Sequence, residues 1–407
     1  MHPNKPIKNL FNQNNAWLMF LNQHIDNIRD SVIENVTKML ACGTAAFGSR
    51  KYCCSNSHCS HIKYIHQTCK SRACNSCGTK ATERWVQAQQ YVLPDCEWQH
   101  ITFTMPDTLW EIFRYNRPLL GLLFNCAAQI LIAWAKNKGI EIGIFCALHT
   151  YGRQLNWNAH IHLSVTRGGI CLKTGAWKPI YFKVEETMAC WRYAVITLLR
   201  EQYNDLDLSA ERYNHLREER DWVHFLDSQY QRYWKVHFAK NTDNMMHTVS
   251  YLGRYLKRPP ISAARLRHCS KGSGVTFDYL DHLITGWTES LTLSAEELIE
   301  RLVEHIPEKG FKMIRYYGFL SNRRRGEMLP KVYEVLDMIE KKKPVVPGYA
   351  AMLKRFVNVD PYECILCQSR IIFTEFRAGT SISKLSASML MSARRTSTIW
   401  PELDQCA

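Results

Sequence analysis

Polar and apolar residues alternate most regularly at residues 148–166, which read LHTYGRQLNWNAHIHLSVT. From 159 to 165 the period is two, which is typical of a half-buried β-strand. Residues two apart on a strand share a face, so His160 and His162 are predicted to project together. If the apolar run at 142–148 pairs with this strand as a hairpin, His149 lies opposite His160. Three histidines then converge on one face.

Patterns elsewhere predict a mixed α+β chain. Between residues 98 and 166 the order is strand, helix, strand, strand, which indicates a ferredoxin-like antiparallel sheet with a helix on one face. The helix at 118–136 is apolar, but Asn125 and Gln129 interrupt it, so it is predicted to be buried and not to span a membrane. Further predicted helices cover 1–41, 79–92, 244–257 and 296–305, and further predicted strands cover 275–279 and 290–293.

These patterns divide the 407 residues into three predicted parts. Residues 1–90 form a helical and zinc-binding domain that contacts DNA, and residues 91–330 form a second domain that carries the histidines. Within it, the charged segment at about 184–240 is expected to be a helical insertion or a solvated helical layer. Residues 331–407 are expected to form a basic linker and a tail with a lone CxxC pair, disordered after about residue 380.

Composition predicts a class of binding partner and a cellular compartment. The formal charge is +15 and the pI is near 9.1. Such an excess of Lys and Arg attracts polyanions, most often nucleic acid, and a merely basic surface is the alternative. No signal peptide is recognisable, and many of the 16 cysteines gather in one short segment. This clustering favours metal binding in a reducing cytoplasm over a secreted disulfide scaffold.

The cysteine segment predicts a structural zinc site. Cys74 and Cys77 form a CxxC pair, and Cys54 and Cys59 form a wider pair upstream, so the four thiolates are predicted to close a tetrahedral Zn²⁺ site. The spacing leaves other ligand sets open. Alternative ligands, for this ion or a second one, are Cys53, Cys69, His61 and His66.

A predicted helix at 244–257, read as NMMHTVSYLGRYLK, carries Tyr251 and Tyr255. Four residues apart, they share one helix face, about 6 Å apart along the axis. A lone YxxxY is usually a pair of core or surface tyrosines. Here basic residues follow it and a histidine strand precedes it, which favours chemistry. His247, one turn earlier, is an alternative third metal ligand to His149, whereas His100 is interpreted as a core or rim histidine.

Metal and tyrosine together suggest phosphoryl transfer. Three imidazoles around a divalent ion leave positions for water and a substrate oxygen, and the ion can polarise a scissile phosphate. A tyrosine with a pKa near 10 is a weak nucleophile, so the ion and nearby cations are needed for phenolate attack. Predicted DNA-contacting residues are Lys70, Arg72, Arg153, Arg254, Lys257, Arg258, Arg323, Arg324 and Arg325. For the loop at 70–72 and the run at 323–325, a solvated basic turn is the alternative.

The motifs resemble those of a known family. NAHIHLSV resembles the HUH motif, and YLGRYLKRPPIS resembles the two-tyrosine helix, of rolling-circle HUH transposases of bacterial insertion sequences (insertion-sequence ninety-one family). CKSRACNSC, HITFTMP and KGFKMIRYYGFLSNRRR are similar to further landmarks of that family. The resemblance covers roughly residues 10 to 330 and does not extend to the tail.

The resemblance implies a fold and a reaction. The fold is an HUH endonuclease with a ferredoxin-like (RRM-like) antiparallel sheet and helices on its faces, within 91–330, after an N-terminal helical and zinc-binding module. The reaction is nicking and rejoining of single-stranded DNA at element ends through phosphotyrosine intermediates. His160 and His162 are implied ligands of Mg²⁺ or Mn²⁺, with His149 as the third by analogy with relaxases, and Tyr251 and Tyr255 are implied nucleophiles.

The implied partners are single-stranded and double-stranded DNA, at element ends and target, in a bacterial, nucleoid-associated cytoplasmic setting without a membrane. The sequence makes no prediction of oligomeric state. Two rival hypotheses stay open. One is a zinc-containing DNA-binding regulator without catalysis, and the other is a metal-dependent hydrolase in which the HxH site activates water. The tyrosine pair distinguishes them, because neither rival needs it.

Overall fold

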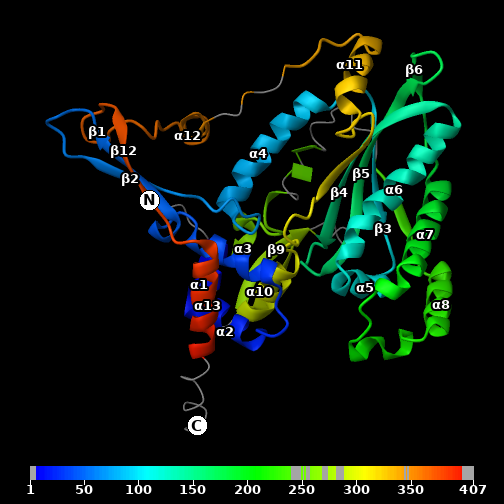
Figure 1. The fold of residues 1–407 in the computed structure, drawn as a ribbon, viewed down its shortest axis with the longest axis horizontal. Coiled ribbons are helices and arrows are strands. Elements are labelled where there is room, and N and C mark those ends of the chain that lie inside the picture. Colours follow the sequence, from blue (N-terminus) through cyan, green and yellow to red (C-terminus); the bar gives the residue numbers. More distant parts are fainter. Residues whose placement is uncertain are drawn as a thin grey trace, which may run out of the picture. The chain divides into compact units, whose positions relative to one another are not determined.

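Two long antiparallel strands, β4 (Ile140–Tyr151) and β5 (Trp157–Cys171), form the centre of a six-stranded sheet (Figure 1). The strand order is β11-β4-β5-β3-β7, and β6 pairs with β5. The other four strands are β3 (Trp98–Thr104), β6 (Trp177–Pro179), β7 (Lys235–Phe238) and β11 (Ile314–Gly318). The structure is a computed structural model that describes residues 6–239, 249–250, 252–253, 257–267, 274–280, 288–342, 345 and 348–396.

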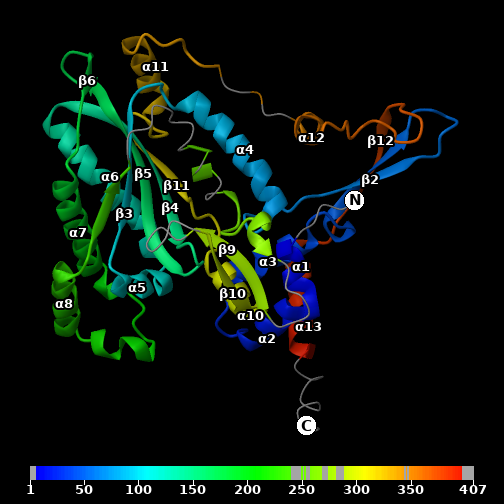
Figure 2. The ribbon, with the colours of Figure 1, turned by 180° about the vertical axis from the view of Figure 1, so that it is seen from behind.

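One face of this sheet packs on helices that follow β3 and β5 in the chain. Ile144, Ile161 and Leu163 point into a large apolar cluster with residues of α6 (Pro118–Asn137) and α7 (Val184–Glu201). Figure 1 shows these two helices along the sheet, and Figure 2 shows them from behind. α6 is long and apolar enough to cross a membrane by length and composition. Its Leu123, Phe124 and Leu131 are instead fully buried in this cluster, so α6 is a core helix.

The opposite face is partly covered by α4 (Asn75–Val92) and α11 (Arg325–Val335). Their buried residues form a second cluster with Trp98, Phe145 and Ala147 of the sheet. The cluster also contains Val249 and Leu252, which are fully buried and helical. All 12 residues of β4 are buried, as expected for a strand covered on both faces.

The chain folds into two compact units. The thiol unit comprises Met1–Arg84, Lys257–Lys309 and Pro344–Ala407, and the histidine unit comprises Trp85–Leu256 and Gly310–Lys343. The histidine unit also contains α5 (Trp110–Tyr115) and α8 (Glu219–Ser228). The expected division was contiguous at 1–90, 91–330 and 331–407. The structure instead joins three distant segments in the thiol unit, because tail and N-terminal strands pair directly.

The thiol unit combines helices with two small antiparallel sheets. One sheet has the order β12-β1-β2 and the other has the order β10-β9-β8. The helices are α1 (Pro6–Asn12), α2 (Ala16–Gln23), α3 (Asp30–Ala41), α10 (Ala295–Glu304), α12 (Tyr349–Val357) and α13 (Ile382–Thr396). The strands are β1 (Gly48–Cys54), β2 (Ile62–His66), β8 (Leu266–Arg267), β9 (Gly274–Leu280), β10 (Thr288–Ser294) and β12 (Ile371–Ala378).

The predicted α+β class with antiparallel sheets is confirmed. Two local predictions were wrong. Of the two alternatives for residues 184–240, the solvated layer is wrong, because Trp191 and Val195 of α7 are fully buried and β7 extends the central sheet beside β3. The helical insertion stays a prediction. Disorder is wrong for residues 382–396, because they form α13, which packs beside α2 and α3 and buries Ala393.

Candidate active site and thiol sites

Three histidines meet on the helix-α4 face of the central sheet. In the β4–β5 pairing His149 lies directly opposite His160, the register expected from the sequence, and His162 lies opposite Ala147. One nitrogen from each imidazole lies within 4.8 Å of the other two, so the three rings are within reach of a common ion. Because residues two apart on a strand share a face, the histidines lie on the same face as Phe145 and Ala147.

Hydrogen bonds fix the orientation of the His160 and His162 rings. His160 Nδ1 lies 2.8 Å from the backbone oxygen of Asn158. A carbonyl can only accept, so Nδ1–H is the donor and the Nε2 lone pair is left for a ligand. His162 Nδ1 lies 3.0 Å from His100 Nε2 and 3.3 Å from Thr102 Oγ1, which directs its Nε2 away from β3.

His100 is therefore a partner of the site. It lies on β3, its Nδ1 is 3.0 Å from Ser164 Oγ, and its ring stacks on that of His162 with centroids 5.3 Å apart. Metal-ligating histidines are commonly oriented by such bonds to their second ring nitrogen. The strand pattern placed His100 at the rim or in the core, but only the β3–β5 register brings it beside His162.

Burial lowers the pKa of three histidines in this group, His160, His100 and His162. It lowers the pKa of His160 to about 4 and the pKa of His100 to about 4. The pKa of His162 lies well below its ordinary value because of burial and, secondarily, the charges of His149, His160 and His100. Neutral imidazole is the form that binds metal. The surroundings of His160 and His162 thus favour the neutral form that can bind a cation.

The predicted nucleophiles, Tyr251 and Tyr255, lie outside the described residues, as do Arg254 and His247. The helical residues around them are informative. Val249 and Leu252 are fully buried in the cluster that contains Phe145 and Ala147, on the histidine face of the sheet. Gly253 is close to α4, because a Cβ there would lie 3.0 Å from the Trp85 ring. Val249 and Leu252 thus pack on the face that carries the histidines.

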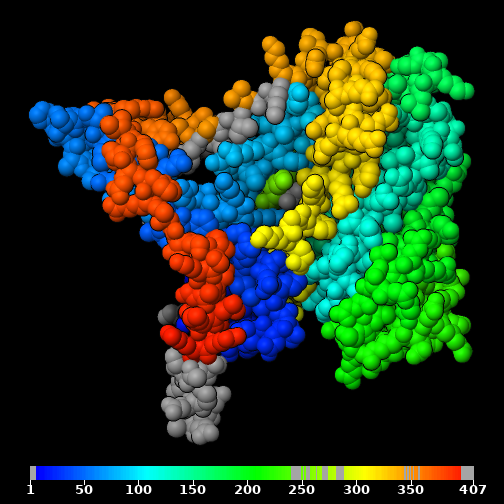
Figure 3. Space-filling view, in the orientation of Figure 1, coloured from blue at the N-terminus to red at the C-terminus, as the bar shows by residue number. Residues whose placement is uncertain are grey.

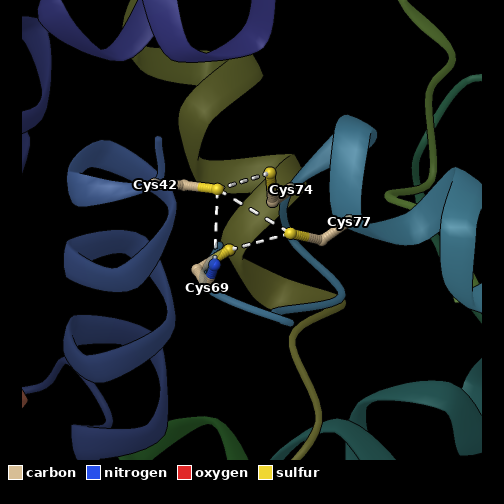
Figure 4. Close-up of side chains that lie close together, drawn as sticks. All are labelled: Cys42, Cys69, Cys74 and Cys77. Atoms are coloured by element: carbon tan, nitrogen blue, oxygen red, sulfur yellow. Dashed lines mark hydrogen bonds between the residues drawn. The ribbon is translucent and has the colours of Figure 1, made fainter. Parts of the chain in front are cut away.

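Four buried cysteines form the first thiol cluster, at the end of α3 and the start of α4 (Figure 4). The sulfur of Cys42 lies 3.7 Å from that of Cys77 and 3.8 Å from that of Cys74, and the Cys69–Cys77 distance is 3.6 Å. A tetrahedral site with Zn–S bonds of about 2.3 Å places sulfurs about 3.8 Å apart. Hydrogen bonds with the Cys69, Cys74 and Cys77 thiols hold the pKa of Cys42 far below its ordinary value.

The second thiol cluster consists of Cys54, Cys59, Cys364 and Cys367. The structure therefore groups the cysteines differently from the expected set, because Cys54 and Cys59 do not join Cys74 and Cys77. β1 pairs with β12 of the tail, so Cys54 at its end lies beside the tail cysteines. Cys74 and Cys77, at the start of α4, lie beside Cys42 instead. Of the alternative ligands, Cys69 belongs to the first cluster, His61 lies 3.1 Å from the Cys364 sulfur, and His66 is on β2 in neither cluster.

Basic residues gather beside the first thiol cluster. Arg72 Nε donates to the backbone oxygen of Arg258, and Arg258 Nε donates to Thr82 Oγ1 on α4. Burial and the neighbouring Arg72 lower the pKa of Lys257. Gly78 permits this approach, because a Cβ there would lie 2.6 Å from the Lys257 carbonyl oxygen. Arg72, Lys257 and Arg258 thus lie together.

The other predicted DNA contacts are scattered. Lys70 is exposed in the loop between Cys69 and Ser71, and Arg153 is exposed on the β4–β5 turn. Arg323 is exposed, whereas Arg324 forms an ion pair of 2.7 Å with the buried Glu141. The Arg325 guanidinium lies 6.0 Å from the centre of the Tyr316 ring. Arg324 therefore has a structural partner within its own unit.

Comparison with known proteins identifies the family. The family described as "Putative transposase" matches residues 143–327, and that described as "Transposase zinc-binding domain" matches residues 12–105. The chain is 46% identical over 383 residues to the "Transposase for insertion sequence element IS801" of Pseudomonas savastanoi pv. phaseolicola, covering 94% of this chain and 92% of that protein. It is 30% identical over 317 residues to the "Putative transposase y4qJ" of Sinorhizobium fredii (strain NBRC 101917 / NGR234), covering 74% and 78%. No solved structure matches the chain.

These matches confirm the family resemblance seen in the motifs. The zinc-binding match and the thiol clusters support structural Zn²⁺ in this chain. DNA is the partner on which a transposase acts, and the basic charge of +15 agrees with it. The chain belongs to the IS91 family of insertion-sequence transposases, with a zinc-binding domain and a transposase domain.

Proposed function

We propose that this transposase nicks and rejoins single-stranded DNA at the ends of its element through phosphotyrosine intermediates, as an HUH endonuclease with two tyrosines. Its metal ligands are His149, His160 and His162, and its nucleophiles are Tyr251 and Tyr255. Double-stranded DNA at the element and the target is the source of the strands. The observation that carries the proposal is the convergence of three imidazoles on the sheet face where Val249 and Leu252 pack.

Each residue has a role that its surroundings support. His160 presents Nε2 because its Nδ1–H is held by the Asn158 carbonyl, and His162 is turned by His100 and Thr102. A Mg²⁺ or Mn²⁺ ion bound there would polarise the scissile phosphate and stabilise the developing charge. A tyrosine hydroxyl attacks phosphorus, loses its proton and forms a phosphotyrosyl bond, while the 3′ oxygen leaves as a hydroxyl. The second tyrosine allows the same step on a second strand.

Strand transfer is the reverse of the cleavage step and needs no ATP. A free 3′ hydroxyl attacks the phosphotyrosine, the phosphodiester bond re-forms and the tyrosine regains its proton. The energy of the phosphodiester bond is conserved in the phosphotyrosine intermediate, so rejoining needs no external energy source. Arg72, Lys257 and Arg258, which lie together just beyond the tyrosine segment, supply positive charge for the DNA backbone.

We also propose that Cys42, Cys69, Cys74 and Cys77 hold a structural zinc ion. Their sulfur separations of 3.6–3.8 Å match a tetrahedral thiolate site. Cys77 is next to Gly78, on which the Lys257 and Arg258 backbone rests. Zinc at this position would fix the first turn of α4 and thereby the end of the tyrosine-bearing segment.

An oligonucleotide that carries an element end tests the proposal. With Mn²⁺ or Mg²⁺, the wild-type protein should form a covalent adduct that survives denaturing electrophoresis. The double variant Tyr251→Phe and Tyr255→Phe should form none, whereas Tyr233→Phe, at a tyrosine that is 77% exposed, should behave like wild type. Adduct formation by the double variant would overturn the nucleophile assignment, and folded wild type without any adduct would favour the DNA-binding regulator.

Substitution of His160 tests the assignment of the metal ligands. His160→Ala should abolish cleavage while it preserves most binding to the same oligonucleotide, because binding depends chiefly on phosphate contacts. Equal loss of both in a variant that is still folded would contradict a metal role. An all-imidazole donor set is softer than the oxygen sets that Mg²⁺ prefers, so we expect Mn²⁺ to activate at lower concentration than Mg²⁺.

A further inference from the structure

The second thiol cluster joins opposite ends of the sequence within the thiol unit. Cys54 ends β1 and Cys59 follows in the turn before β2, whereas Cys364 and Cys367 lie in the tail before β12. The contacting pairs Cys54–Cys367 and Cys59–Cys364 are 313 and 305 residues apart in the chain. The matched zinc-binding region ends at residue 105, so it does not include the tail cysteines.

The sulfur geometry suits one ion better than two disulfides. Cys59 and Cys364 sulfurs are 3.7 Å apart, and Cys54 and Cys367 sulfurs are 3.3 Å apart. All four sulfurs also lie within 4.8 Å of one another. A tetrahedral zinc site requires about 3.8 Å between each pair. Two separate disulfides would need only two close pairs and no common centre.

The surrounding bonds are those of a metal-binding loop. Cys364 N–H donates to the Ser369 carbonyl at 2.8 Å, Gln368 N–H donates to the Cys364 carbonyl at 2.8 Å, and Gln368 has a φ of 59°. These bonds fold the CxxC segment into a tight turn with both sulfurs on one side. Outside the four sulfurs, His61 Nδ1 lies 3.1 Å from the Cys364 sulfur, and the Asn56 N–H donates to the Cys54 sulfur at 3.5 Å. A donor aimed at a sulfur, as the Asn56 N–H is, stabilises a thiolate.

The sheet around this cluster has a small apolar core. Among the described residues, that core contains three buried members, Tyr52, Cys364 and Ile371. On β12, Ile372, Phe373 and Phe376 are each more than half exposed. A core of this size stabilises a sheet by only a few kcal/mol, and small modules of this kind commonly depend on a metal.

We propose that Cys54, Cys59, Cys364 and Cys367 bind a second structural zinc ion that joins the C-terminal tail to the N-terminal hairpin. The zinc makes β12 a permanent strand of the β12-β1-β2 sheet. In Figure 3 the orange and red tail lies against the blue N-terminal segment along this sheet and along α13. The proposal does not depend on strand-transfer chemistry, so each can fail alone.

Zinc stoichiometry of the purified full-length protein is the first test. Wild type should contain two zinc ions per chain by elemental analysis. The double variant Cys364→Ser and Cys367→Ser, which lacks the two tail ligands, should contain one. The double variant Cys54→Ser and Cys59→Ser, which lacks the two N-terminal ligands of the same site, should also contain one. Cys53→Ser is the matched control, because Cys53 is the neighbour of Cys54 on β1 but belongs to neither cluster, and it should retain two.

A spectroscopic measurement identifies the ligands. Wild type reconstituted with Co²⁺ should show visible bands of tetrahedral thiolate coordination with twice the intensity of the Cys364→Ser/Cys367→Ser variant. Hydrogen exchange at β12 amides should accelerate in that variant while exchange at β4 stays slow. One zinc per chain in wild type that is retained in the Cys364→Ser/Cys367→Ser variant would overturn the proposal. So would two ions retained after loss of both tail cysteines, or disulfides found by mass mapping at these four positions.

Discussion

The central sheet and the β12-β1-β2 sheet are both antiparallel but differ in what stabilises them. In the central sheet Ile161, Leu163 and Val165 of β5 are fully buried beneath α6 and α7. In the small sheet three buried members of the described chain form the apolar cluster, and thiols lie at its edge. Hydrophobic burial thus fixes the strands that carry the histidines, whereas the small sheet has little apolar core and would depend on the zinc coordination proposed for its thiols.

The largest expected effect follows from zinc removal. A structural zinc site contributes on the order of 10 kcal/mol to the folding of a small module. A strong chelator should therefore abolish protection from hydrogen exchange in β1, β2, β12 and the first turn of α4. Protection in β4 and β5 should persist, because their stability comes from apolar burial. Equal loss of protection in both sheets would remove the distinction between them.

Truncation of a buried side chain should be next in size. Leu163→Ala removes a fully buried side chain from the central sheet and should lower the free energy of unfolding by about 2–5 kcal/mol in urea titrations. Its counterpart Ile372→Ala on β12 truncates a side chain that is 52% exposed, and it should cost less than about 0.5 kcal/mol. Similar losses at both positions would mean that the small sheet buries more surface than the structure indicates.

The central hairpin was the part most readable from the sequence. Alternation along β5 and the apolar run of β4 predict the pairing of His149 with His160, because both signals are local and the turn between them is short. The role of His100 was not predictable, because it depends on which strand lies beside β5. The pairing of β3 with β5 is set by tertiary packing and leaves no mark on the spacing of residues.

The ligand sets of the two thiol clusters, in contrast, could not be predicted from the sequence. Cysteine spacing indicates that metal sites exist, but it carries no information on pairing across 305 residues, so the tail CxxC remained without partners. Cys42 was missed as a ligand because it lies alone at the end of α3. The tail helix did carry a signal, since Ile382, Leu385, Met389 and Ala393 recur at helical spacing.

Removal of the bond between His100 and His162 should have an intermediate effect. His100→Ala leaves His162 Nδ1 without its 3.0 Å partner. We therefore expect an increase on the order of 10- to 100-fold in the Mn²⁺ concentration needed for half-maximal cleavage. Saturating Mn²⁺ should restore much of the rate, which a loss of folding would not allow. His224→Ala on α8 is the control and should leave the metal requirement unchanged.

The smallest expected effect is the difference between substitutions of Arg323 and Arg324. Arg324→Ala removes the partner of the buried Glu141 and should lower stability by about 1 kcal/mol. Arg323→Ala should leave stability unchanged and weaken binding to an oligonucleotide, with a reduced dependence of affinity on salt. If Arg324→Ala weakened DNA binding more than Arg323→Ala at equal stability, Arg324 would be the DNA contact and its ion pair incidental.

Tyr251 and Tyr255 are the residues on which the proposed mechanism depends most. The direct measurement is peptide mapping, by mass spectrometry, of the covalent adduct between the wild-type protein and a nicked element-end oligonucleotide. We predict a nucleotide attached to the hydroxyl of Tyr251 or Tyr255 and to no other residue. An adduct mapped to a serine or to another tyrosine, or a nicked product without any adduct, would contradict the two-tyrosine mechanism.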